Sequence, residues 1–130
     1  MKGVKKNSQG AIEFIIIFIA FLFFFTIFFS AIKINNEKKE LEKQKVIAQN
    51  VALDAQYEIN LASESSEGYS RRFNVPENIY GKDYDLYITD NRVFVFIDDF
   101  SISYKVAGVT GSLQKGSNVI SKENGEVFLN

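Results

Sequence analysis

The chain has 130 residues, with 15 basic and 16 acidic side chains, no histidine and no cysteine. Without those two residue types it can form no disulfide, no thiolate or imidazole metal site and no catalytic pair that depends on them. From Val46 onward seven basic residues face twelve acidic ones, which argues against a DNA- or RNA-binding protein.

Residues 1–8 form a short leader that carries three lysines, and an apolar segment follows it. Within residues 14–32 only Thr26 and Ser30 are not apolar. As a helix this segment would be roughly 28 Å long, close to the ~30 Å hydrocarbon core of a bilayer. It is longer than the ~7–15 apolar residues of an ordinary secretory signal peptide. We therefore expect it to cross the membrane with the N-terminus in the cytoplasm.

The helix is expected to continue beyond the apolar segment and to cover residues 9–62. Residues 33–62 contain no Pro or Gly and are rich in good helix formers. The pair Asn35-Asn36 is the one place where a break could fall. Apolar side chains recur on one helical face at Leu41, Ala48, Ala52, Ala55, Ile59 and Ala62. We predict that this amphipathic half packs on the protein's own head.

Residues 63–130 are predicted to form that head, a small antiparallel β-sheet of four to six strands. A polar run that closes with Gly68 ends the helix. Alternating apolar and polar residues predict a hairpin with its turn at Asp90-Asn91, a third strand, a second hairpin and a weaker strand before them. The first hairpin is expected at 84–89 and 93–97, and the third strand at 100–106. The second hairpin is expected at 119–120 and 127–129, and the weaker strand at 72–75. The predicted fold class is therefore α+β.

The head has many acidic and tyrosine side chains but no arrangement that looks catalytic. Its acids are dense enough to suggest a cation site, at Asp83, Asp85, Asp90, Asp98 and Asp99. No spaced set of further ligands accompanies them, and Asp98-Asp99 between two strands favours a turn. The tyrosines are interpreted as strand residues and contact surface. We expect neither an enzyme nor a bound metal or other cofactor.

Glu13 is a carboxylate at the mouth of the apolar segment. Deep in a bilayer such a charge costs about 2.5–3.5 kcal/mol, and less near the interface. At the first turn of a membrane helix a glutamate would also be favoured by the helix dipole. The residues around Glu13 favour a more specific role.

After the leader Lys5-Lys6-Asn7-Ser8 the chain reads Gln9-Gly10-Ala11-Ile12-Glu13-Phe14 and runs straight into the apolar segment. This arrangement resembles the N-terminus of archaeal type IV pilin-like proteins with a class III signal peptide. In that family the mature protein begins with a motif of the form Gln-x-Ser-x-Glu-Phe. The resemblance implies cleavage between Ser8 and Gln9, whereas a cut after Gly10 would place Glu13 differently in the mature chain. The processing and assembly motif comprises Lys5, Lys6, Gln9, Gly10, Ala11, Ile12, Glu13 and Phe14, with Ala11 where the family has Ser.

The resemblance also implies partners and a location. The precursor would lie in the cytoplasmic membrane with its head outside, until a prepilin peptidase removes residues 1–8. A pilus assembly ATPase and a membrane platform protein would then place the helix among other pilin helices, in a homo- or hetero-oligomeric filament. There Glu13 would pair with the α-amino group of a neighbour's Gln9. The chain would be a major or minor pilin of an extracellular filament for adhesion, with motility left open.

The alternative is a permanently membrane-anchored accessory or binding protein with an extracytoplasmic β head. A membrane-tethered enzyme is a third class, and only the scattered acids speak for it. The N-terminus of the native protein separates the first two classes, because only a pilin would begin at Gln9.

Overall fold

The computed structural model describes the backbone of residues 2–130 and the side chains from Lys6 onward. The predictions that concern Met1 and the Lys5 side chain lie outside the described residues. The long helix α1 runs from Lys2 to Glu64 without interruption, so the predicted continuous helix is confirmed and no break falls at Asn35-Asn36. The chain divides into two compact units, and the boundary between them lies within this helix, after Leu41. The second unit runs from Glu42 to Asn130.

In the first unit the apolar segment of α1 is exposed on every side. The large apolar side chains between Ile12 and Ile34 have exposed fractions of 41% to 70%. The two hydroxyl groups bond within the helix: Thr26 donates to the Leu22 carbonyl at 2.8 Å and Ser30 to the Thr26 carbonyl at 2.9 Å. Because these hydroxyls are already satisfied, the helix presents an apolar surface all round. By length and composition it is able to span a membrane.

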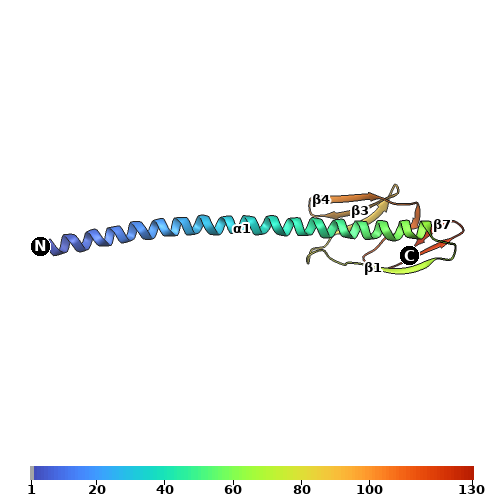
Figure 1. Cartoon of the computed structure of the whole chain (residues 1–130), viewed down its shortest axis with the longest axis horizontal. Coiled ribbons are helices and arrows are strands. Elements are labelled where there is room, and N and C mark those ends of the chain that lie inside the picture. The colour runs from blue at the N-terminus through green and yellow to red at the C-terminus, as the bar shows by residue number, and fades with distance from the viewer. Residues whose placement is uncertain (1) are drawn as a thin grey trace. The chain divides into compact units, whose positions relative to one another are not determined.

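The second unit contains seven strands in two sheets, so the α+β class is confirmed. The four-stranded sheet has the order β1 (Ser70–Val75), β6 (Gly116–Glu123), β7 (Glu126–Leu129) and β5 (Val109–Gly111). The three-stranded sheet has the order β2 (Asp85–Thr89), β3 (Arg92–Ile97) and β4 (Phe100–Lys105). The strands lie beside the C-terminal part of α1 (Figure 1).

Both predicted hairpins form, and their turns explain why. Asp90 and Asn91 have φ values of 50° and 56°, and Asn124 and Gly125 have values of 53° and 79°. Two successive residues with positive φ make the type I′ turn, whose twist matches that of the flanking strands. The turn predicted at Asp98-Asp99 joins β3 to β4, with Asp98 at a φ of 49°. The weaker strand is also confirmed, as β1.

The head differs from the prediction in its sheet topology. The strands form two sheets rather than one, and β5 was not predicted. This short strand pairs in parallel with β7, so its sheet is mixed, while the other strand pairs are antiparallel as expected. Residues 106–115 show no alternation of apolar and polar side chains. The pairing of β5 depends on a strand that follows later in the chain, which local pattern does not reveal.

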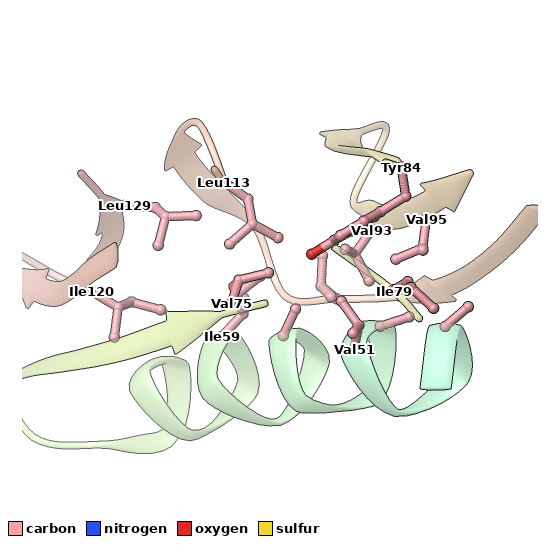
Figure 2. Packing of buried hydrophobic residues seen from close by; sticks show 14 of the residues in the cluster. Val51, Ile59, Val75, Ile79, Tyr84, Val93, Val95, Leu113, Ile120 and Leu129 are labelled. Atoms are coloured by element: carbon pink, nitrogen blue, oxygen red, sulfur yellow. The ribbon is translucent and has the colours of Figure 1, made fainter. Parts of the chain in front are cut away.

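The core lies between α1 and the two sheets (Figure 2). The predicted helix stripe is buried from Ala48 to Ala62, with Val51 as a further member. Leu41 is an exception, with 48% of its surface exposed. Ile59 packs near Val75, and Val51 faces the side of the core that contains Val93 and Val95. The alanines let both sheets approach the helix closely, and each buried Ile or Val contributes about 1.5–3 kcal/mol.

Side chains of α1 also satisfy backbone groups at the edge of the three-stranded sheet and just after it. The Gln56 side chain donates to the Lys105 backbone carbonyl at 2.7 Å, and the side-chain oxygen Oδ1 of Asn60 accepts from the Ala107 backbone amide at 3.0 Å. At the helix C-terminus, Lys122 of β6 donates to the carbonyls of Ser63 and Ser65 at 2.7 and 2.9 Å. These bonds fix the helix against both sheets beyond what apolar packing alone would do.

Candidate functional site

The motif residues from Gln9 to Phe14 all lie within α1, and their side chains are exposed. Ser8 and Gln9, which flank the expected cleavage site, are helical as well. Gly10 has open space around it, since a Cβ added there would meet no atom within 4 Å. A glycine costs about 1 kcal/mol relative to alanine in a helix interior, so Gly10 makes the helix easier to unwind near the Ser8–Gln9 bond.

Gln9 and Glu13 are four residues apart and therefore lie on the same face of the helix. Their Cα atoms are separated by about 6 Å along the helix axis, four residues at a rise of ~1.5 Å. Between Lys6 and Lys33, Glu13 is the only charged side chain. Any partner that neutralises this carboxylate within an apolar environment must therefore come from outside this stretch of the chain.

The phenylalanines of the apolar segment form ridges along the helix surface. Phe14 stacks on Phe18 with ring centroids 6.2 Å apart, and Phe25 meets Phe29 edge-on at 4.5 Å. Both pairs have the i,i+4 spacing that brings side chains together on a helix. Beside these ridges lies a shallow apolar hollow of about 520 Å³, lined by Phe21, Phe24, Phe25, Ile27, Phe28 and Ala31. Ridges and hollows of this kind are the surface relief with which helices pack against one another.

The acidic side chains of the head lie mostly at strand ends and turns. Asp83 forms an ion pair with Lys115, and Asp98 forms one with Lys82 at 2.8 Å. The hydrogen bond from Lys115 lowers the pKa of Asp83 below its usual range. Among the described residues, no group of three or more His, Cys, Asp or Glu is placed to hold a metal ion.

The tyrosines have different environments. Tyr87 of β2 is exposed and stacks on Phe94 of β3, with ring centroids 5.2 Å apart. Tyr84 is buried and donates its hydroxyl hydrogen to the Pro76 carbonyl. Burial raises the pKa of Tyr84 to about 12, and the nearby charge of Asp83 adds to this effect. Tyr104 lies on β4, whereas Tyr69 and Tyr80 lie outside the strands.

The structure thus brings the motif residues together on one short helical segment and places the acids at turns. The feature that sequence reasoning did not single out is the outer face of the three-stranded sheet, where Tyr87 and Phe94 stack. The alternation of residues 84–97 could have indicated this face, because aromatic residues alternate with the buried valines and so point to the other side of the sheet. A scan against protein-family models finds no match, and searches of curated proteins and of solved structures find no significant similarity.

Proposed function

We propose that this chain is a pilin-like structural subunit of an archaeal type IV pilus-like surface filament. The observation that carries the proposal is the form of α1. An exposed apolar helix begins with a single carboxylate, Glu13, in the QGAIEF register, and continues without a break into the core of a β head.

Processing would occur at the bond between Ser8 and Gln9. Hydrolysis by a membrane-embedded prepilin peptidase would release the basic leader and create a new α-amino group on Gln9. The mature helix would then begin with a positive charge and carry its carboxylate one turn later. The glycine at position 10 favours the local unwinding that a protease needs to reach a helical peptide bond.

Assembly would pair these two charges between copies. Glu13 lies about 6 Å further along the helix than Gln9, so a neighbour displaced along the axis by a similar distance brings its α-amino group to the carboxylate. Each charge alone is costly in apolar surroundings, and pairing offsets that cost. The pair would therefore set the stagger between adjacent subunits.

The apolar helix would leave lipid and enter a bundle of equivalent helices. Lipid tails are as apolar as Phe or Ile, so the gain comes from packing of ridges into hollows and not from the hydrophobic effect. A repeating filament also needs a heterologous interface that does not close on itself. A long apolar helix supports such an interface because copies can stack along it at a constant offset.

The test is the N-terminus of the protein recovered from sheared, purified surface filaments. Mass spectrometry is expected to find a chain that begins at Gln9. A chain that begins at Met1, or one cut near Ala31, would contradict the proposal. Recovery of the protein in membranes but never in filaments would contradict it as well.

The second candidate is a permanently anchored accessory or binding protein with an extracytoplasmic head. The observation that favours it is the same apolar segment, which is able to span a membrane by itself. That function would need neither cleavage nor the carboxylate, so it predicts an intact Met1 and no effect of replacing Glu13.

A further inference from the structure

The outer face of the three-stranded sheet carries an unusual set of exposed side chains. The register places Asp85 opposite Phe96, and Tyr87 opposite Phe94. Phe96 of the central strand β3 and Tyr87 of the adjacent edge strand β2 are 43% and 46% exposed. We call the group Asp85, Tyr87, Phe94 and Phe96 the aromatic face. Clustered exposed aromatic side chains of this kind usually mark a contact surface.

One end of the aromatic face opens into an acidic notch of about 230 Å³, lined by Asp83, Tyr84, Asp85, Phe96 and Asp98. Two of these carboxylates already pair with Lys115 and Lys82. Asp85 is exposed and makes no ion pair with any described residue. A free carboxylate beside an exposed aromatic ring is suited to a cation, which gains from both the charge and the ring face.

An opposite charge is present on the same chain. Residues 33–45 contain five lysines and three glutamates, whereas the chain from Val46 onward has seven basic and twelve acidic residues. Ile34, Lys38 and Leu41 recur at i, i+4 and i+7 and therefore share one helical face, which we call the collar face. Ile34 and Leu41 are 54% and 48% exposed, and Lys38 forms no ion pair among the described residues.

The two faces are complementary in chemistry. The collar face places a lysine between two exposed aliphatic side chains, and the aromatic face places a carboxylate beside exposed rings. We propose that the aromatic face of one copy docks on the collar face of a second copy, with Lys38 entering the notch beside Asp85 and Phe96. The inference rests on the proposed filament function.

Symmetry favours a second, different surface over self-pairing of the aromatic face. If two aromatic faces met each other, the contact would be isologous and would close into a dimer. Like charges would also meet at Asp85, which is destabilising. A contact between the aromatic face and the collar face is heterologous, and it repeats from copy to copy along a filament.

The test uses charge reversal in full-length chains, with filament recovery as the readout. Lys38→Glu is expected to lower the amount of subunit in sheared filaments at least about tenfold, because like charges would then meet at the notch. Adding Asp85→Lys in the same chain is expected to restore recovery. Lys43→Glu is the matched control, since Lys43 lies on the opposite side of the helix and carries the same charge change.

A second measurement uses the absence of cysteine from the chain. The double variant Leu41→Cys with Tyr87→Cys is expected to give a ladder of disulfide-linked multimers when filaments are oxidised. Leu41→Cys with Tyr57→Cys is the control, because Tyr57 is exposed but lies outside the aromatic face.

The outcomes separate this inference from the proposed function. Equal effects of Lys38→Glu and Lys43→Glu, or failure of Asp85→Lys to restore recovery, would overturn the docking while filaments that begin at Gln9 still stand. A Phe96→Ser variant that forms normal filaments but loses surface attachment would also overturn it and would indicate an external ligand. Failure of the unaltered chain to enter filaments would overturn both.

Discussion

Gly111 is a residue at which the backbone leaves no room for a side chain. It has a φ of 115°, and a Cβ added there would lie 1.9 Å from the Leu129 carbonyl oxygen. That oxygen belongs to β7, the strand with which β5 pairs in parallel. Any side chain at this position must therefore push the two strands apart.

We expect Gly111→Ala to lower the free energy of unfolding by about 2–4 kcal/mol, because it combines backbone strain with a clash against a main-chain atom. Chemical denaturation of the detergent-solubilised full-length chain, followed by circular dichroism, measures this. Gly108→Ala is the control, since the nearest atom to its added Cβ is 4.0 Å away. Equal stability of the two variants would contradict the role given to the β5–β7 contact.

Tyr84 makes the stability of the head sensitive to alkaline pH. Burial raises its pKa to about 12, so the folded state favours the neutral phenol more than the unfolded state does. The resulting stabilisation is fully present below pH 10, the ordinary pKa of tyrosine, and is lost as pH rises from about 10 to about 12. The loss is on the order of 2 kcal/mol.

The Tyr84→Phe variant provides the comparison, because phenylalanine cannot ionise. It is expected to be less stable near pH 8, where it lacks the bond to Pro76, but to show a shallower decline between pH 10 and 12. Unfolding curves of both proteins over that range measure the difference. Parallel declines would show that Tyr84 is not the group responsible.

At the scale of elements, the C-terminal end of α1 is capped by Lys122 of β6, which donates hydrogen bonds to backbone carbonyls there. Lys122 donates to the backbone carbonyls of Ser63, in the last turn of the helix, and Ser65, just beyond its end. A cation at this end is favoured by the helix dipole and satisfies carbonyls that the helix itself leaves unpaired. The same bonds connect β6 to the helix.

We expect Lys122→Met to lower the free energy of unfolding by about 1–2 kcal/mol, since it keeps most of the apolar stem but removes the charge and its hydrogen bonds. Lys105→Met is the matched control, because its side chain is exposed on β4. Denaturant titration of the full-length proteins tests the pair. A loss of stability in the control as large as in Lys122→Met would contradict the capping role.

The elements that the sequence revealed are those with local causes. Asp90-Asn91 and Asn124-Gly125 are residue types typical of turns, and the alternating apolar and polar residues on either side of them predict the hairpins. Leu41 shows the limit of periodicity, which identifies a helical face but not the residue at which its burial begins. The strand β5 depends on a parallel partner near the C-terminus, and neither its length nor its composition marks it.

In the candidate site, too, the sequence predicts the features that depend on neighbouring residues and misses those that depend on tertiary pairing. The motif from Gln9 to Phe14 is contiguous, so its residues could be identified without a structure. The aromatic face combines residues of two strands with a notch that includes Asp83 and Asp98. The alternation of residues 84–97 places aromatic side chains on this face, but which of them are neighbours is known only from the register of β2 and β3, because pairing decides which side chains meet.

At the scale of the whole molecule, the apolar helix is suited to two environments in succession. In a bilayer its exposed Phe and Ile side chains meet lipid, and in a filament they would meet copies of themselves. Glu13 distinguishes the two states. Near the membrane interface the carboxylate costs little, but in a helical bundle it would need the α-amino group of a neighbour.

Glu13→Gln therefore separates membrane insertion from assembly. We expect the variant to enter the membrane and to be cleaved before Gln9 as efficiently as the unaltered chain. Its incorporation into filaments is expected to fall at least about a hundredfold, because one unpaired α-ammonium group per subunit would remain in apolar surroundings at a cost of about 3–5 kcal/mol. Quantitative mass spectrometry of membrane and sheared-filament fractions measures all three quantities.

Glu37→Gln, at an exposed position of the same helix, is the control for the loss of one negative charge. If Glu13→Gln enters filaments as well as Glu37→Gln does, then Glu13 serves only the membrane stage, and the anchored-protein alternative gains the support.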